Sequence, residues 1–401
     1  MNTQIQDAYI VAATRTPVAK RNGMFRTVRP DDMLAHVLAA VVAKVPGLDA
    51  REIGDVIVGC AMPEAEQGMN VARIGLLLAG LPNTVPGITI NRFCSSGLQA
   101  VADAAARIRL GEADVMIAAG TESMSMVPMM GNSPSLSPTI FSDPDDIESY
   151  GIAYGMGLTA EKVAQQWKVS REAQDEFAYQ SHMKAIAAMK AGEFANEITP
   201  VEVADRSVDL DSAEVTIARR SVNIDEGARP DTTPEGLAKL RTVFSARGSV
   251  TAGNSSQTSD GAGALILASE AAVKRFGLKP LARFVSYASK GVPPHIMGIG
   301  PIEAIPAALK YAGLKHQDMD WIELNEAFAA QSLAVMNTLG LDPSKVNPMG
   351  GAIALGHPLG ATGAIRSATV VHALQRKNLK YGMVTMCVGT GQGAAGIFER
   401  V

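Results

Sequence analysis

The chain is poor in cysteine and in aromatic residues, and it carries no excess of positive charge. Its 401 residues include 3 cysteines and 5% aromatic residues, and its formal net charge is −4 at pH 7. Three cysteines without paired spacing do not supply a disulfide framework, and an acidic balance argues against nucleic acid as the main partner. No segment resembles a signal peptide or has the roughly 20 consecutive apolar residues that span a membrane. We therefore expect a cytoplasmic protein with no nucleic-acid or membrane partner.

Metal-ligand spacing is also missing. Five histidines show no such spacing with one another or with the cysteines, namely His36, His182, His295, His316 and His372. Residues 391–396 match the dinucleotide-binding pattern G-x-G-x-x-G, but the segment after them is too short for the helix that this pattern requires. We expect neither a metal ion nor a bound dinucleotide.

One cysteine lies in a setting that favours a reactive thiolate. Cys94 follows the strand-like residues 87–90 and begins an alanine-rich stretch with a helical pattern. The first turn of a helix carries unpaired N–H groups and the positive end of the helix dipole, and both lower the pKa of a thiol. The alternative is that Cys94 is a small buried core residue, as free cysteines often are.

Two glycine-rich segments favour the reactive role. Residues 347–360 contain His357, and residues 386–393 contain Cys387 and Gly389. Glycine-rich turns let the backbone approach a ligand closely and direct its N–H groups at it. A histidine and a second cysteine in such turns indicate a site with proton-transfer chemistry.

Four motifs together resemble the signatures of the thiolase family. They are residues 91–100 (NRFCSSGLQA), 325–329 (NEAFA), 347–360 (NPMGGAIALGHPLG) and 386–393 (MCVGTGQG). The resemblance covers essentially the whole chain.

The sequence also contains an internal repeat. Gly47 and Gly313 each precede a strand-like segment. The number of residues that separates them also separates Cys94 from Gly360 and Gly97 from Gly363. In each half, short apolar strands alternate with amphipathic helices, which predicts mostly parallel sheets covered by helices. The family resemblance implies the duplicated thiolase fold, with two similar α/β halves in a five-layered α-β-α-β-α core.

A stretch of different character separates the halves. It becomes helical between residues 159 and 191, with Ser170 as a candidate N-cap, and then becomes charged and loop-like. We expect an N-terminal half of residues 1–121 plus 249–272, an inserted loop domain of residues 122–248, and a C-terminal half of residues 273–401. Acidic residues are interspersed among the arginines of the insertion, so charge alone indicates a solvated surface.

The resemblance gives two residues near the end of the insertion a more specific role. It implies that the adenine of coenzyme A lies against Arg229 and that Ser256 contacts the pantetheine. The flat guanidinium of arginine can stack on a purine. Coenzyme A is therefore expected as a cosubstrate, with no tightly bound cofactor.

The resemblance further implies an acyltransferase that cleaves 3-ketoacyl-CoA with CoA through an acyl-cysteine. Cys94 is the expected nucleophile, and His357 either takes its proton or holds it as a thiolate. Cys387 is the acid and base for the enolate and the incoming CoA. One oxyanion is assigned to His357 and a water held by Asn325, and the other to the N–H groups of Cys94 and Gly389.

Two alternatives share the fold. A biosynthetic acetoacetyl-CoA thiolase would condense two acetyl-CoA units, but Gly155 stands where such short-chain relatives usually carry histidine, and residues 255–261 resemble the degradative pattern of β-oxidation. A non-catalytic acyl-CoA or lipid carrier is disfavoured because the motifs at 325–329 and 356–358 are intact. Thr390 stands where many members have glycine, which leaves the acyl length open.

The resemblance implies a homodimer or homotetramer. Because degradative bacterial members of the family join such a partner, the resemblance also suggests a complex of this chain with the β-oxidation enzyme that performs the preceding oxidation.

Overall fold

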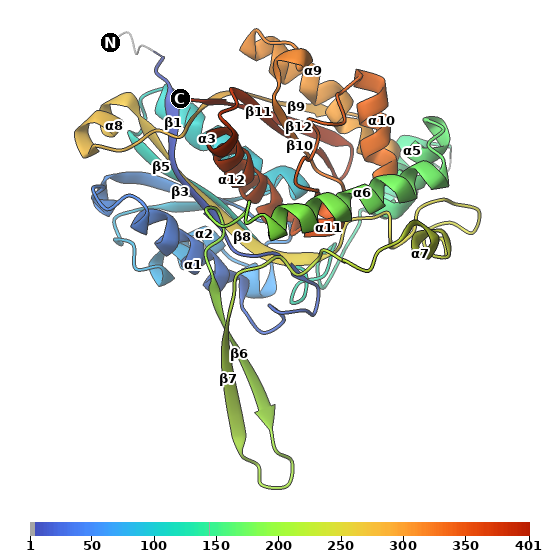
Figure 1. Cartoon of the computed structure of the whole chain (residues 1–401), viewed down its shortest axis with the longest axis horizontal. Coiled ribbons are helices and arrows are strands. Elements are labelled where there is room, and N and C mark those ends of the chain that lie inside the picture. Colours follow the sequence, from blue (N-terminus) through green and yellow to red (C-terminus); the bar gives the residue numbers. More distant parts are fainter. Residues whose placement is uncertain (1–4, 144) are drawn as a thin grey trace.

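Strands from both halves of the chain form one hydrogen-bonded path in the computed structural model, which describes residues 5–143 and 145–401. The strand order is β10-β11-β12-β9-β1-β8-β5-β3-β4 (Figure 1). The N-terminal part contains β1 (Ala8–Arg15), β3 (Ile53–Gly59), β4 (Gly87–Ile90), β5 (Val115–Ser123) and β8 (Ser259–Ser269), with the short β2 (Ala19–Lys20) beside β8. The C-terminal part contains β9 (Ala282–Gly291), β10 (Trp321–Leu324), β11 (Tyr381–Val388) and β12 (Gln392–Arg400).

The two parts repeat one topology. In the first, β1 pairs antiparallel with β8, β8 antiparallel with β5, and β5 parallel with β3. In the second, β9, β12, β11 and β10 follow the same order and the same directions. The duplication is therefore confirmed, but the expectation of mostly parallel strands is wrong. The three residues between β11 and β12 can connect only an antiparallel pair, because a parallel connection needs a long crossover.

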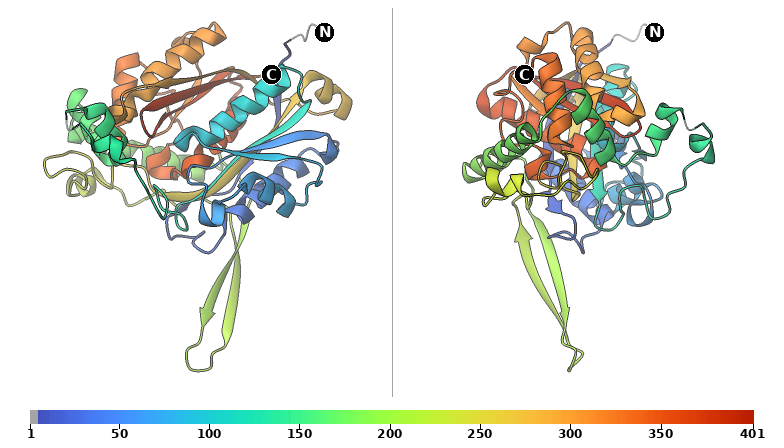
Figure 2. Two further views of the ribbon diagram at one scale, coloured as in Figure 1. Left: turned by 180° about the vertical axis from the view of Figure 1, so that it is seen from behind. Right: turned by 90° about the vertical axis from the view of Figure 1, so that its right-hand side faces the viewer.

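Helices cover both outer faces and fill the space between the two parts (Figures 1 and 2). The outer helices are α1 (Pro30–Ala43) and α2 (Val71–Leu78) on the N-terminal side, and α9 (Gly300–Ala312) and α10 (Ala329–Leu339) on the C-terminal side. Between the strands of the two parts lie α3 (Ser96–Arg109) and α12 (Leu359–Lys377). Separate apolar clusters hold these layers together, which gives the expected five-layered core.

The two central helices touch backbone to backbone near their first turns. A Cβ added to Gly97 would lie 2.6 Å from the backbone nitrogen of Ala364, and a Cβ added to Gly363 would overlap the backbone of Leu98. Gly97 and Gly363 are the positions that the internal repeat relates to each other. Side chains at these positions would push the helices apart, so the glycines bring the N-terminal ends of α3 and α12 together.

The segment between β5 and β8 carries its own elements. These are α4 (Ile147–Ile152), α5 (Met156–Gln166), α6 (Arg171–Lys190), β6 (Val201–Val208), β7 (Val215–Val222) and α7 (Pro234–Ala238). Ser170 caps α6 by accepting from the N–H of Ala173 at 3.2 Å, so the predicted N-cap is confirmed. The expected single helical stretch is interrupted before this cap, where Lys168 has a positive φ of 54°.

The charged part of this segment differs from the expectation of a loop. Strands β6 and β7 pair along their whole length and project from the body as a ribbon (Figures 1 and 2). Only the residues at its base, such as Val201 and Val203, are buried. The two remaining helices are α8 (Glu270–Phe276) and α11 (Ala352–Leu355). Within the described ranges, no helix is both long enough and apolar enough to cross a membrane.

Candidate active site

Cys94 lies in a tight turn directly before α3. The side chain of Asn91 accepts from the N–H of Phe93 at 2.8 Å, and Phe93 adopts a φ of 43°, which is rare for a bulky side chain. The turn, Phe93–Ser95, contacts both α12 and β11. Cys94 is therefore held where elements of the two halves meet, and only 8% of its surface is exposed.

The electrostatic setting of Cys94 differs from the sequence-based expectation. Burial raises the pKa of its thiol to about 11, although hydrogen bonds from the N–H groups of Gly389 and of Cys94 itself act in the opposite direction. The predicted lowering is wrong because desolvation of the thiolate outweighs the stabilisation from these donors. Burial also lowers the pKa of His357 to about 3, with a smaller effect from the charge of Arg366. Both groups are therefore neutral at pH 7.

Gly389 begins the turn between β11 and β12 and directs its N–H at the sulfur of Cys94. A Cβ added there would lie 3.6 Å from Cδ2 of Phe93 and 3.8 Å from Sδ of Met156, which are ordinary contacts. Residues of the protein would therefore not exclude a small side chain at position 389. The next residue, Thr390, has a φ of 63°, a strained conformation for a β-branched residue, and its hydroxyl donates to the carbonyl of Gly389 at 2.6 Å.

His357 lies in the extended segment that leads into α12. Its Nδ1 is 2.7 Å from Oγ1 of Thr362, and that hydroxyl in turn is 3.0 Å from the carbonyl of Pro358. The hydroxyl has one proton to donate, and the carbonyl can only accept, so we assign the proton of the imidazole to Nδ1. Nε2 then carries a lone pair and can act as a base.

Asn325 follows β10 and faces that lone pair. Its Nδ2 lies 3.3 Å from Nε2 of His357, and its backbone N–H donates to the carbonyl of Thr385 in β11 at 2.9 Å. The side-chain oxygen of Asn325 is buried and has no hydrogen-bond partner among the described residues. A buried acceptor without a partner favours a site that receives a further donor.

Cys387 lies on β11 and is fully buried beside Phe328 and Met297. Burial raises the pKa of its thiol above the ordinary value, and the charge of Cys94 adds to this effect. The two sulfurs are therefore close enough for one to affect the ionisation of the other. The third cysteine, Cys60, is also buried, and burial and the charge of Glu122 raise its pKa.

Arg229 and Ser256 both lie on loops. Arg229 is exposed after β7, and its backbone N–H donates to Nδ1 of His182 on α6 at 3.2 Å. The N–H of Ser256 donates to the carbonyl of Ala327 at 2.9 Å, which places this loop against the 325–329 motif. The structure thus brings Cys94, His357, Asn325, Cys387 and Gly389 into one region and places Ser256 next to it.

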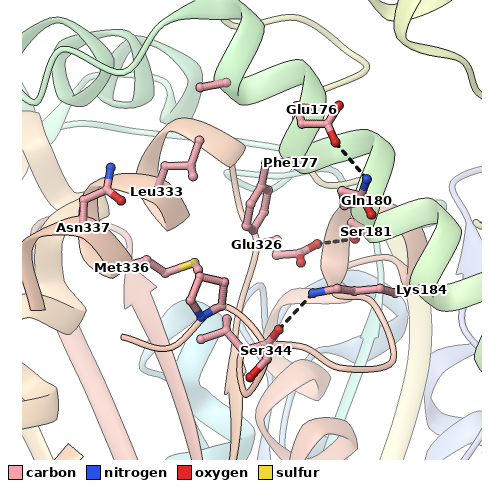
Figure 3. A pocket seen from close by; sticks show the side chains of 13 residues that line it. Glu176, Phe177, Gln180, Ser181, Lys184, Glu326, Leu333, Met336, Asn337 and Ser344 are labelled. Atoms are coloured by element: carbon pink, nitrogen blue, oxygen red, sulfur yellow. Dashed lines mark hydrogen bonds between the residues drawn. The ribbon is translucent and has the colours of Figure 1, made fainter. Parts of the chain in front are cut away.

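The hydrogen bonds of Glu326, which no motif predicts, anchor the glycine-rich segment before His357. Glu326 is buried and accepts from Oγ of Ser181 at 2.6 Å, from Nδ2 of Asn347 at 2.8 Å and from the N–H of Ile353 at 3.2 Å. Figure 3 shows Glu326 directed at Ser181 of α6, at a cavity of about 540 Å³ between α6 and α10. The residues that line this cavity do not include Cys94, Cys387, His357 or Asn325.

Comparisons with known proteins agree with this arrangement. Residues 8–271 match the model of the thiolase N-terminal domain, and residues 278–400 match that of the thiolase C-terminal domain. A 3-ketoacyl-CoA thiolase of Bacillus subtilis is 50% identical over 98% of this chain and 100% of its own length.

Two solved structures extend the likeness to three dimensions. The acetyl-CoA acetyltransferase of Bacillus anthracis has a TM-score of 0.89 at 38% identity, with both chains covered completely. Human mitochondrial 3-ketoacyl-CoA thiolase in complex with CoA has a TM-score of 0.87 at 39% identity, with 99% of each chain covered.

The contact between His357 and Thr362 generates a prediction about the imidazole. Thr362→Val keeps the side-chain shape but removes the oxygen that accepts from Nδ1–H, and an unpaired buried donor costs about 1–3 kcal/mol. We expect ¹⁵N NMR of the wild type to show the proton on Nδ1, and Thr362→Val to weaken this preference. Thr362→Ser, the control, should preserve it. A wild-type proton on Nε2, or no change in Thr362→Val, would contradict the assignment.

Proposed function

Because the chain belongs to the thiolase family of acyltransferases, we propose that it cleaves 3-ketoacyl-CoA with CoA to give acetyl-CoA and a shortened acyl-CoA. The observation that carries this proposal is the pairing of two buried sulfurs, Cys94 and Cys387, beside a neutral histidine. Acyl transfer requires one nucleophile, whereas cleavage of a carbon–carbon bond also requires a group that protonates the departing carbon. A second thiol supplies that group.

The first half-reaction forms the acyl-enzyme. The sulfur of Cys94 adds to the C3 carbonyl of the substrate while its proton moves to Nε2 of His357. The C2–C3 bond then breaks, its electron pair leaves as the enolate of acetyl-CoA, and Cys387 donates its proton to C2. Because the pKa of Cys94 is near 11 and that of His357 near 3, a preformed ion pair is unfavourable. The proton therefore leaves the thiol as the carbon–sulfur bond forms.

The second half-reaction releases the acyl group. Cys387, now a thiolate, takes the proton of the CoA thiol, and the CoA sulfur attacks the acyl group on Cys94. The Cys94–acyl bond breaks, and the proton held by His357 returns to the Cys94 sulfur. The burial that raises the pKa of Cys387 makes its thiolate a strong base, so the proton transfer from CoA is favourable.

Negative charge on oxygen is stabilised at two places. The N–H groups of Cys94 and Gly389 are directed at the Cys94 sulfur and are placed to donate to the oxygen of the tetrahedral adduct. His357 and Asn325 serve the enolate oxygen, with a water held by the Asn325 amide. The Asn325 amide can pair with His357 in either protonation state. Its Nδ2 donates to Nε2 when that nitrogen is unprotonated, and after the amide rotates by half a turn its oxygen accepts from Nε2–H.

Coenzyme A is the cosubstrate in this proposal. The inserted loop domain, residues 122–248, supplies Arg229 for the adenine, and Ser256 contacts the pantetheine next to the 325–329 motif. The exposed guanidinium of Arg229 and the hydrogen bond from Ser256 to Ala327 support this placement. CoA bound to the human mitochondrial relative supports it as well.

The direction of the reaction is tested by measuring thiolysis and condensation side by side. Gly155, at the N-terminal end of α5, has a φ of −60° and open space where a side chain would stand, so the position could hold a histidine but does not. We expect thiolysis of longer 3-ketoacyl-CoA substrates to exceed that of acetoacetyl-CoA, with slower condensation of acetyl-CoA. A preference for acetoacetyl-CoA together with efficient condensation would favour the biosynthetic alternative. No turnover in either direction would contradict the proposal.

The assignment of Arg229 predicts a selective effect on CoA affinity. Stacking of a guanidinium on an aromatic ring contributes about 0.5–2 kcal/mol, so Arg229→Ala should raise the KM for CoA by about 2- to 30-fold and change kcat little. Arg219→Ala on the exposed ribbon is the matched control, because it removes the same charge from the same inserted segment. Equal KM values for both variants and the wild type would argue against the adenine site.

A further inference from the structure

The side chain of Arg92 links the two turns that surround the Cys94 sulfur. Its Nε donates to Oε1 of Gln99 at 2.7 Å, and its Nη1 donates to Oε1 of Gln392 at 2.7 Å. Gln99 lies on α3, immediately after the Cys94 turn, and also accepts from the hydroxyl of Tyr287 at 2.8 Å. Gln392 lies at the start of β12, immediately after the turn that contains Gly389.

We propose that Arg92 is a positioning residue that fixes the Gly389 N–H relative to the Cys94 sulfur. The proposal rests on the roles assigned above to Cys94 and Gly389. Gln392 is the β-ladder partner of Val388, so the two residues close the turn 389–391. A side chain that holds Gln392 therefore limits movement of the whole turn. Within that turn, the strained φ of Thr390 favours relaxation once the restraint is removed.

The link is strong enough for this role. Both bonds of Arg92 have a charged donor, and such bonds contribute about 1.5–3 kcal/mol each, more than bonds between neutral groups. The bond to Gln392 connects residues from different halves of the chain, and the bond to Gln99 ties Arg92 to α3. Apart from the hydrogen bond from the Gly389 N–H to the Cys94 sulfur, no other side-chain hydrogen bond among the described residues joins these two turns.

Arg92 has two ways to affect Cys94: directly through its charge, or by holding the turn that contains Gly389. The groups around Cys94 and the neutral partner Gln392 distinguish these two effects. The groups whose charge or hydrogen bonds act on the Cys94 sulfur are the N–H groups of Gly389 and Cys94 and the carboxylate of Glu122 on β5, and Arg92 is not one of them. Gln392 is neutral. A change at Gln392 therefore loosens the turn and leaves the charge of Arg92 in place.

The test compares Arg92→Met, Gln392→Met and the double variant with the wild-type protein. Iodoacetamide alkylation of Cys94 is followed by peptide mapping from pH 7 to 9.5, and the rate of acylation by acyl-CoA is measured beside it. Loss of the Gly389 hydrogen bond disfavours the thiolate, so alkylation at each pH should slow about 3- to 10-fold. Acylation should slow at least tenfold, short of the 10²–10³ lost with a complete oxyanion donor.

Two outcomes decide the proposal. Similar decreases in the alkylation and acylation rates of both single variants, with little further decrease in the double variant, would support the proposed link between Arg92 and Gln392. Arg92→Lys should recover part of these rates. A loss in Arg92→Met but none in Gln392→Met would show that the charge acts directly and would overturn the proposal. Thermal unfolding identifies any variant with a general folding defect, and Gln99→Met is the control for the other partner. Failure of the wild type to be acylated would contradict the proposed function, whereas the alkylation comparison would still test Arg92.

Discussion

Backbone contact between the two central helices determines how the two halves of the chain meet. Gly97 on α3 and Gly363 on α12 leave no room for side chains, so each helix packs against the backbone of the other. Cys94 lies directly before α3, and His357 lies directly before α12. Close approach of the helix ends therefore brings the proposed nucleophile from one half of the chain toward the proposed base from the other. Neither half contains all of the residues of the proposed site.

The same close packing determines the electrostatics of the site. Removing water raises the pKa of Cys94 and lowers that of His357, and both shifts favour the neutral groups. A dry site also strengthens each hydrogen bond to a developing charge, so the N–H of Gly389 acts most strongly when an oxyanion forms. Cys94 and His357 are thus neutral before the reaction, and in the proposed mechanism the site stabilises the negative charge that develops on oxygen during it. The hydrogen bond from His357 to Thr362 supports this arrangement by leaving Nε2 unprotonated.

Local motifs and their repeat made much of this predictable from the sequence. Cys94, His357, Asn325 and Cys387 could be assigned to one site because each lies in a short, recognisable segment at the end of a strand or the start of a helix. The pKa of Cys94 was predicted in the wrong direction, since burial by distant segments is not visible in a local pattern. The contacts from Ser181 to Glu326 and from Arg92 to Gln392 were also missed, because each joins residues far apart in the chain. The exposed ribbon of β6 and β7 was taken for a loop because its charged residues obscure the strand alternation.

Cys94 and Cys387 have separate roles in the proposed reaction, and the Cys387→Ala variant distinguishes these roles. The variant is mixed with acyl-CoA, the reaction is stopped, and peptide mapping locates the acyl group while thiolysis and condensation are measured in parallel. The division of roles between the two cysteines predicts an acyl group on Cys94, with both carbon–carbon reactions slower by about 10²–10⁴, the range for a lost general acid and base. Near-normal thiolysis in this variant, or an acyl group attached to Cys60 in place of Cys94, would contradict it.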